Sequence, residues 1–401
     1  MDGTASQIGH AKALAAEALL RDALPPELVP LFAPVFIRSH DLYGEFVYRL
    51  ALDVIRKTGL DAALEEPGNP REIVARASLA VDRALVPLDW MLRYVAARGG
   101  LEELDGGGSS RYRLPGPLPA LDPAPVQDEQ LRYDPSWKPA YALAETVAQD
   151  YPAFLRGDLD GEDVLFAPRR LRLWIEYFSN DNGLYVVNNR VGAVAAEQWL
   201  PRSGVLLELG GGLGSGALAL LERFRAAGRL GAIDEYRFTE FVAPFLRRGE
   251  QTLRARYPAL PPFTFAALDM NRPLGEQGVA PASITLVYAV NTLHVAHDLD
   301  LTLREIRAAL EPGGRLIVSE CVRPRPRQPL SAEFVFNLTE TFRSPRLHPV
   351  HRPTGGFLTP EQWQAAMEAA GFVDVRFLPD VARIRDLVPD FTVAAIGASR
   401  P

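Results

Sequence analysis

Apolar residues recur every three or four positions over residues 1–115, and this spacing predicts helices. One helix is expected between positions 41 and 55, with Gly59 ending the run. Asn69 and Pro70 predict the N-cap and the first position of a second helix. The apolar face of the first helix is formed by Leu42, Phe46, Val47, Leu50 and Val54.

A third helix is expected to run to Arg98, followed by a glycine-rich hairpin. Because a proline deeper in a helix would break it, Pro87 is expected in the first turn. Two short strands, 101–104 and 111–114, flank the turn at 105–110. Three helices and a hairpin predict a winged-helix domain, which we expect to serve packing or dimerisation.

The rest of the chain follows two other patterns. The proline-rich segment 115–139 has little periodicity and is expected to be a linker, with a helix from Ala140. Later, strand-like runs alternate with helical ones, which is typical of a parallel, doubly wound α/β sheet. The predicted domains are 1–115, 116–189 (linker and connecting helices) and 190–401 (sheet). The candidate strands are 205–209, 237–241, 264–268, 284–290, 315–319, 373–377 and 392–396.

Charge and cysteine content exclude several classes of protein. The chain has 43 Lys and Arg residues against 50 Asp and Glu, a net charge of −7. This balance argues against nucleic acid or an anionic membrane as the main partner. The predicted winged helix adds to this, because residues 69–115 carry a net charge of only +1. The single cysteine, Cys321, excludes an intramolecular disulfide and a thiolate zinc cage.

No targeting pattern is evident in the sequence. Residues 1–30 lack the basic-then-apolar layout of a signal peptide. No segment approaches the roughly 18 uninterrupted apolar residues needed to span a bilayer. We therefore expect a cytoplasmic protein without a membrane partner.

The segment 205–216 (VLLELGGGLGSG) reads as a strand that enters a glycine-rich turn, and 217–225 as the following helix. Glycines let a ligand approach the backbone, and the helix N-terminus can bind it. Gly210, Gly212 and Gly214 give a G-x-G-x-G spacing that differs from the dinucleotide pattern. Glu208 would repel a pyrophosphate, but it suits a cationic amino group such as that of S-adenosylmethionine.

Two further acids follow the next two predicted strands. Glu240 is placed to accept hydrogen bonds from ribose hydroxyls, and Asp269 to contact an adenine amino group. Met270 is available to pack on the adenine ring. Each acid alone would suit a surface position or a helix cap. Three acids at the carboxyl ends of successive strands indicate a ligand site, because open α/β sheets bind ligands there.

From Val205 to about Phe372 the sequence resembles class I S-adenosylmethionine-dependent methyltransferases, in particular the methyltransferase domains of polyketide synthases. The N-terminal region resembles the winged-helix dimerisation domain of small-molecule O-methyltransferases, which implies a homodimer. Together the two resemblances imply a Rossmann-like, seven-stranded methyltransferase sheet with S-adenosylmethionine as cofactor. The matching segments include 237–246, 288–295, 310–320 and 357–363.

The resemblance also implies the reacting residues. In the polyketide domains, the histidine of the Asn-x-Leu-His segment is the general base, and a glutamate closing the next strand orients it. Those positions are His294 and Glu320 here, and Asn291 of the same segment is predicted to bind the cofactor. The alternative is structural: His294 caps a strand and Glu320 pairs with Arg323.

Other polar residues leave choices open. His297, Asp298 and Asp300 are expected to begin a helix, and no metal site is predicted. Residues 323–356 form an insertion of the kind that covers active sites. The roles of four residues within or near such covering segments stay open; they are His348, His351, Tyr177 and Tyr185.

The sequence therefore predicts a methyltransferase that acts on a small natural-product acceptor, either free or carrier-bound. The acceptor atom is an oxygen or an acidic carbon next to a carbonyl. One alternative is a winged-helix regulator that senses S-adenosylmethionine without turnover. Another is a non-methylating enzyme on the same cofactor fold.

Overall fold

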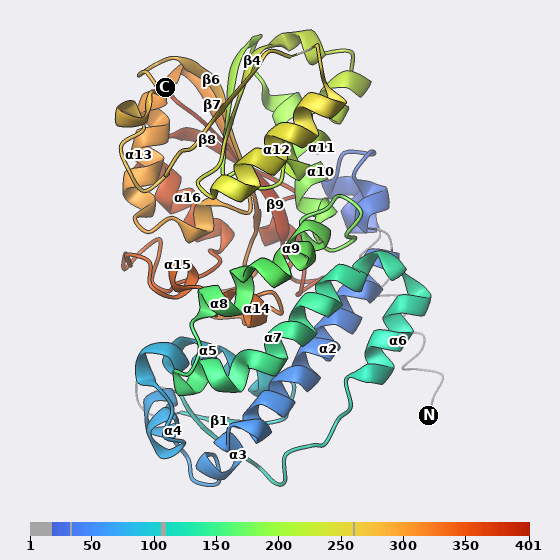
Figure 1. Ribbon diagram of the computed structural model, residues 1–401, viewed down its shortest axis with the longest axis vertical. Coiled ribbons are helices and arrows are strands. Elements are labelled where there is room, and N and C mark those ends of the chain that lie inside the picture. Colours follow the sequence, from blue (N-terminus) through green and yellow to red (C-terminus); the bar gives the residue numbers. More distant parts are fainter. Residues whose placement is uncertain (1–17, 33, 106–109, 260) are drawn as a thin grey trace. The chain divides into compact units, whose positions relative to one another are not determined.

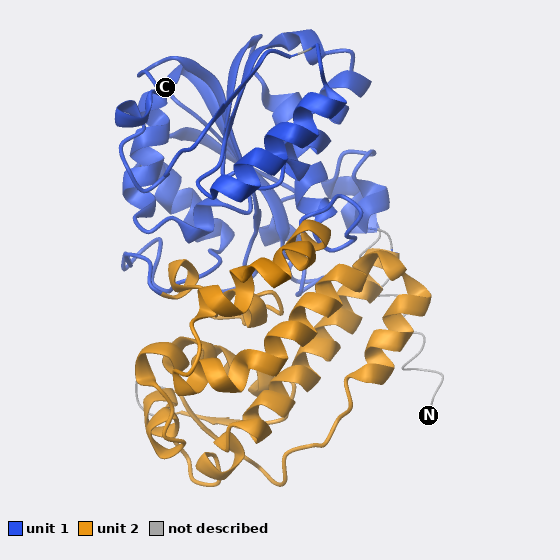
Figure 2. Cartoon of the chain, viewed as in Figure 1, with its two compact units in different colours: residues 1–34, 178–326, 344–401 blue, residues 35–177, 327–343 orange. Residues whose placement is uncertain are grey.

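The computed structural model describes residues 18–32, 34–105, 110–259 and 261–401. Contacts divide the chain into two compact units, which Figure 2 colours separately. Unit 1 comprises residues 1–34, 178–326 and 344–401, and unit 2 comprises 35–177 and 327–343. The expected absence of a leader falls in part on residues 1–17, outside the described residues. The boundaries near 115 and 189 that the sequence suggests stay a prediction.

Unit 2 is mainly helical and begins with the expected order of helices and a hairpin. It contains α2 (Pro34–Lys57), the short unpredicted α3 (Leu60–Ala63), α4 (Pro70–Arg76) and α5 (Val81–Ala96). The strands β1 (Glu102–Leu104) and β2 (Arg111–Arg113) then pair antiparallel. Most of the predicted turn at 105–110 lies outside the described residues. The order matches the one expected for a winged helix.

The N-terminus of α4 confirms the cap predicted from sequence. Asn69 Oδ1 accepts a hydrogen bond from the Glu72 backbone N–H at 3.0 Å. Glu72 Oε2 accepts from the Asn69 backbone N–H at 3.1 Å, which completes a capping box. Pro70 occupies the first helical turn, where its missing N–H costs nothing.

The position expected for Pro87 was wrong. The helix α5 begins at Val81, so Pro87 lies inside it rather than in its first turn. The proline ring removes one N–H donor, which leaves the carbonyl of Arg83 without its usual helical partner. The buried side of α5 already includes Ala84 and continues through Leu88 and Met91. Burial of this face outweighs the lost hydrogen bond and draws the helix start upstream of the proline.

The segment 115–139 is more ordered than a linker. It contains α6 (Ala124–Tyr133), in which Gln130 is buried and donates through Nε2 to Ser39 Oγ at 3.0 Å. Because this buried contact is made by a polar side chain, the pattern of apolar residues does not predict it. The remaining elements of unit 2 are α7 (Lys138–Arg156), α8 (Gly161–Phe166), α9 (Leu171–Tyr177), α14 (Glu333–Phe336) and α15 (Glu340–Arg343).

Unit 1 contains a seven-stranded sheet in the order β5-β4-β3-β6-β7-β9-β8. All seven predicted strands are present; the strand 284–290 has the predicted ends, and the other six are shifted at one or both ends. Those from β3 to β7 run parallel, whereas β9 runs antiparallel to both β7 and β8. The sheet is therefore mixed rather than wholly parallel, because only the four-residue α17 (Val381–Ile384) lies between β8 and β9 and no long crossover helix carries the chain back. The strands are β3 (Gly204–Leu209), β4 (Ile233–Thr239), β5 (Phe263–Ala266), β6 (Ile284–Val290), β7 (Leu310–Cys321), β8 (Val373–Leu378) and β9 (Val393–Ser399).

Helices cover both faces of this sheet, as Figure 1 shows. The helices α10 (Val186–Trp199) and α11 (Ser215–Ala226) pack together, and α13 (Leu299–Ala309) packs with α16 (Pro360–Ala369) on the other side. Double coverage explains why every residue of β6 is buried. The helix α12 (Ala243–Arg256) follows β4. None of the helices within the described residues has the length and apolar character needed to cross a bilayer.

The capping box gives a stability prediction. Asn69→Ala removes the side-chain oxygen that holds the first turn of α4, so the free energy of unfolding should fall by about 1 kcal/mol. Urea denaturation measures the change. Asn69→Asp keeps the acceptor and should retain most of the stability, and equal loss in both variants would contradict the capping role.

Candidate functional site

The turn between β3 and α11 keeps its backbone open at the carboxyl edge of the sheet. Gly210, Gly212 and Gly214 have φ values of 62°, 57° and 89°, which side chains other than glycine rarely adopt. A Cβ at Gly210 would lie 2.4 Å from Thr292 Cγ2. A Cβ at Gly212 would meet no atom within 4 Å. The turn is thus packed at its start and open at its middle, where a ligand can approach the main chain.

Glu208 lies beneath this turn and is 1% exposed. Its Oε2 accepts a hydrogen bond from the Tyr236 hydroxyl at 2.8 Å. Burial raises the pKa of this carboxyl to about 8, opposed by the Tyr236 hydrogen bond and assisted by the charge of Glu240. A buried acid of this kind gains stability from a cation placed against it. Tyr236 belongs to no recognised motif, so no sequence pattern marked it as a site residue.

Glu240 joins the end of β4 to the glycine turn. Its Oε2 accepts from the Gly212 N–H at 2.9 Å, and its Oε1 accepts from the Val242 N–H at 2.7 Å. Burial raises the pKa of Glu240, and these N–H donors lower it in part. The carboxylate therefore positions the glycine turn as well as facing the edge where a ligand would lie.

Asp269 and Met270 lie in the loop after β5, and both are half-buried. Asp269 Oδ1 accepts from the backbone and side-chain nitrogens of Asn271, at 2.9 and 3.1 Å. The Met270 carbonyl accepts from Thr302 Oγ1 in α13 at 2.9 Å. Since β5, β4 and β3 are adjacent and parallel, their three acids lie along one sheet edge, in the arrangement that the sequence suggested.

The next two strands bring His294 and Glu320 together. His294 lies in the 3-10 turn η6 (Leu293–Val295) after β6, and Glu320 is near the end of β7. His294 Nδ1 and Glu320 Oε2 are 2.6 Å apart, and both side chains are buried. Because a carboxylate only accepts hydrogen bonds, Nδ1 donates and Nε2 carries the lone pair. The His294 ring also packs against Phe357, with centroids 4.7 Å apart.

The second oxygen of Glu320 holds the backbone of the same turn. Glu320 Oε1 accepts from the N–H groups of Thr292, Leu293 and His294 at 3.1, 2.9 and 3.3 Å. Arg323, the alternative partner considered for Glu320, donates through Nε to the Phe357 carbonyl at 3.0 Å. One carboxylate therefore holds both the backbone of the turn and the orientation of the His294 ring.

Asn291 and Tyr185 connect the two halves of the edge. Asn291 has a left-handed backbone, with φ of 49°, and its Oδ1 accepts from the Cys321 N–H at 3.0 Å. Tyr185 forms a side-chain hydrogen bond with Asn291 and feels the charges of Glu208, Glu240 and Glu320. Burial raises the pKa of its hydroxyl well above the ordinary range. Tyr185, whose role the sequence left open, thus belongs to this edge; no spacing rule pointed to it.

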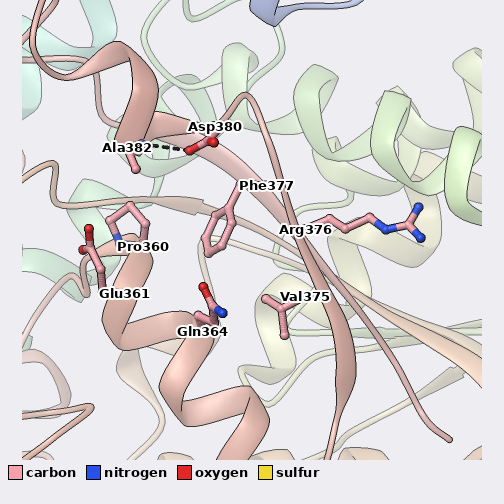
Figure 3. A pocket seen from close by; sticks show the side chains of 8 residues that line it. All are labelled: Pro360, Glu361, Gln364, Val375, Arg376, Phe377, Asp380 and Ala382. Carbon is pink, nitrogen blue, oxygen red and sulfur yellow. Dashed lines mark hydrogen bonds between the residues drawn. The ribbon is translucent and has the colours of Figure 1, made fainter.

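Two other features are Tyr177 and a surface cleft. Tyr177 belongs to unit 2, where its ring contacts Trp174 and Phe336 at centroid distances of 5.8 and 6.3 Å. A surface cleft beside α16 and β8 contains none of the predicted site residues (Figure 3). Its lining residues are Pro360, Glu361, Gln364, Val375, Arg376, Phe377, Asp380 and Ala382.

Asp300, His348 and His351 form a cluster that the sequence did not reveal, with candidate ligand atoms within 4.8 Å of one another. His351 Nε2 lies 2.7 Å from Asp300 Oδ1, and His348 Nδ1 accepts from the Val350 N–H at 3.2 Å. The two imidazole rings stack at 3.7 Å and 9°. The in-plane lone pairs of two stacked rings lie in separate planes. This arrangement suits the contact between His351 and Asp300 better than a metal ion shared by both rings. The expectation of no metal site stays a prediction.

Comparisons with known proteins agree with this geometry. Residues 207–316 match a family described as "Methyltransferase domain". This part of the chain is therefore similar to methyltransferase domains. A highly reducing polyketide synthase 2 of Gibberella zeae is 31% identical over 266 residues, 63% of this chain, and PksM of Bacillus subtilis is 26% identical over 265 residues, 64% of this chain. The chain spans 10% and 6% of the length of these two relatives.

Solved structures show the same fold over nearly the whole chain. The CurJ carbon methyltransferase matches with a TM-score of 0.74 and 21% identity, covering 97% of this chain and 99% of its own. The DszA carbon methyltransferase matches with a TM-score of 0.71 and 20% identity, covering 96% and 95%. These likenesses support the class I methyltransferase fold predicted from the sequence.

S-adenosylmethionine is the cofactor that this methyltransferase domain indicates, and the residues present fit it. The open backbone at Gly212 leaves room for a ligand beside α11. Glu208 is a buried acid suited to a cationic group, and Glu240 is a carboxylate one strand away. Met270 offers half-exposed apolar surface at the next strand.

The buried acid gives a pH prediction. The folded protein keeps a proton on Glu208 up to about pH 8, whereas the unfolded chain releases it near the ordinary value of 4.5. Stability therefore falls as the pH rises between these values, by up to about 1.4 kcal/mol per pH unit from this group. Urea midpoints at pH 5.5 and 7.5 should show a smaller decline for Glu208→Gln than for the wild type. Tyr236→Phe keeps the carboxyl and should keep the decline; an equal decline in Glu208→Gln would contradict the assignment.

Proposed function

We propose that this protein is an S-adenosylmethionine-dependent methyltransferase that methylates an acidic carbon next to a carbonyl. The proposed substrate is an acyl chain of polyketide type, held as a thioester on a carrier. The observation that carries the proposal is the His294–Glu320 pair, 2.6 Å apart on the same sheet edge as the glycine turn. A base beside the cofactor turn is what proton removal before methyl transfer requires.

The relatives favour carbon over oxygen as the methyl acceptor. The curated relatives are named polyketide synthases, and the two structures above are titled carbon methyltransferases. A carbon flanked by two carbonyls is acidic enough to lose its proton to an imidazole. Methylation of a hydroxyl oxygen, which the N-terminal winged-helix pattern favours, is the competing outcome of the experiment below.

In the proposed mechanism, the chain's own groups supply the base and its orientation. His294 Nε2 removes the proton from the acceptor carbon. Glu320 holds the tautomer through Nδ1 and stabilises the imidazolium that forms. Bound S-adenosylmethionine supplies an electrophilic methyl group. Burial of His294 and Glu320 excludes water from the base, so alignment rather than solvent determines its reactivity.

The cofactor assignments are also proposals. Glu208 and the turn formed by Gly210, Gly212 and Gly214 would hold the methionine end. Glu240 would bind the ribose hydroxyls, and Asp269 with Met270 the adenine. Asn291 would complete the site through its link to Tyr185. A homodimer formed through the N-terminal helices stays a prediction.

The activity can be tested with a β-ketoacyl thioester of pantetheine and methyl-labelled S-adenosylmethionine. We expect one label in the product, located on the carbon between the carbonyls by NMR. A label on oxygen would overturn the carbon assignment and retain the transferase. Intact cofactor binding without transfer to carbon or oxygen acceptors would overturn the transferase proposal.

The base can be tested without methyl transfer. His294→Gln should lower turnover by about 10²–10⁴-fold, the usual contribution of a general base. The same variant should lose exchange of the acidic C–H with D2O in the presence of S-adenosylhomocysteine, followed by mass spectrometry. His297→Gln changes an exposed imidazole nearby and should keep both rates. Wild-type exchange in His294→Gln would contradict the base assignment.

The ribose assignment gives a binding prediction. Glu240→Gln replaces one oxygen with an NH2 group, which must face the backbone N–H of either Gly212 or Val242. S-adenosylhomocysteine should bind at least about tenfold more weakly by calorimetry, since an unmet buried donor costs about 1–3 kcal/mol. Glu235→Gln on the same strand is the matched control and should bind normally. Unchanged affinity in Glu240→Gln would remove Glu240 from the site.

A further inference from the structure

Arg352 is a fully buried cation beside the histidine turn, with 1% of its surface exposed. Its Nη1 donates to the Ala296 carbonyl at 2.6 Å, and its Nη2 donates to the His294 carbonyl at 2.8 Å. Glu320 accepts the N–H groups of the same turn. The turn is therefore held through its N–H groups by one charged side chain and through its carbonyls by another.

This arrangement does not resemble an ordinary structural ion pair. Among the described residues, no carboxylate lies within ion-pair distance of Arg352, and its buried Nε lacks a hydrogen-bond partner. Burial lowers its pKa to about 10, so the guanidinium stays charged at neutral pH. Asp298, Asp300 and Glu320 act on it only at longer range. A buried charge with so little compensation is costly, which points to a role beyond stability.

The segment around Arg352 is fastened where the helix after the histidine turn begins. His351 Nε2 lies 2.7 Å from Asp300 Oδ1, and Arg346 Nη1 lies 2.6 Å from Asp298 Oδ2. The backbones of His348 and Arg352 pair as an isolated bridge. These contacts keep the guanidinium against the turn.

We propose that Arg352 is a positioning residue for His294, an inference that rests on the proposed function. Its two donors fix the carbonyl side of the turn, so that the imidazole keeps one orientation toward the acceptor. The other charged groups around this turn are Glu320 on β7, and Asp298 and Asp300 at the start of α13.

Two variants test the two donor contacts of Arg352. Arg352→Met removes both contacts and should lower kcat by about 10²-fold, the scale expected for a small misplacement of a reacting group. Its KM for S-adenosylmethionine should not change. Arg352→Lys keeps the charge with fewer donors, so its kcat should lie between those of Arg352→Met and the wild type. Guanidinium ion should partly restore Arg352→Ala.

The matched control is Arg400→Met. Arg400 also donates through Nη1 to two backbone carbonyls, those of Ala308 and Leu310, at the opposite end of β7. This variant removes the same kind of contact away from the histidine turn. Its stability should fall, whereas its kcat and its His294 ¹⁵N signals should match those of the wild type.

Spectroscopy supplies a readout that a merely structural role of Arg352 would not change. The chain has six histidines, so ¹⁵N spectra can resolve His294, assigned by its loss in His294→Gln. In Arg352→Met the His294 nitrogen signals should differ from those of the wild type, because the ring no longer keeps one orientation and one tautomer. Arg352→Lys should show a smaller difference.

The outcomes distinguish this inference from the proposed function. If the wild type transfers no methyl group, the proposed function fails, and the ¹⁵N spectrum still tests whether Arg352 orients the ring. Wild-type His294 signals in folded Arg352→Met would overturn the inference, as would an unchanged kcat. If Arg352→Met does not fold, the other two variants decide. The inference then fails if the kcat of Arg352→Lys equals that of Arg400→Met and guanidinium ion does not restore the activity of Arg352→Ala.

Discussion

The carboxylate of Glu320 is the interaction on which the candidate site depends. It lies fully buried at the junction of β6 and β7 and receives four N–H donors, three from the backbone and one from His294. An unpaired carboxylate there would be prohibitively costly, so the turn and the imidazole are both drawn to it. Neighbouring parallel strands make the contact possible, because their carboxyl ends meet at one edge.

The cofactor side of the same edge follows a similar rule. Glu240, from the neighbouring strand, accepts the N–H of Gly212, so the glycine turn takes its shape from β4 as well as from its own dihedral angles. Glu208 remains buried beneath this turn with a raised pKa. In both halves of the site, an acid from one strand organises the loop that follows another. The order of the strands therefore determines the arrangement of the site residues as much as the glycine motif does.

The insertion after β7 does not have a single role. Residues 327–343 belong to unit 2, whereas 344–356 return to unit 1. There Arg352 reaches the carbonyls of the histidine turn, from a position 58 residues further along the chain than His294. One stretch of sequence thus contributes to both units, and its second part supports the histidine turn. Next to Arg352, the His351 ring contacts the Asp300 carboxylate.

Local patterns in the sequence determined much of the fold. Apolar runs located all seven strands, Asn69 and Pro70 marked a helix start, and the glycine spacing marked the turn after β3, because each depends on neighbours close in the chain. Pro87, the helix α6 and the direction of β9 needed tertiary structure, since burial and chain connection outweighed local preference there. The acids Glu208, Glu240 and Asp269 could be placed on one edge from strand order, and His294 with Glu320 from resemblance. Tyr185, Tyr236 and Arg352 could not, because their partners lie far away in the sequence and no motif spacing links them. The sequence by itself therefore determined the strands, the glycine turn and the acids of the edge. Only the packed sheet decided which buried charged groups contact one another, because the partners of a buried charge are set by proximity in space and not along the chain.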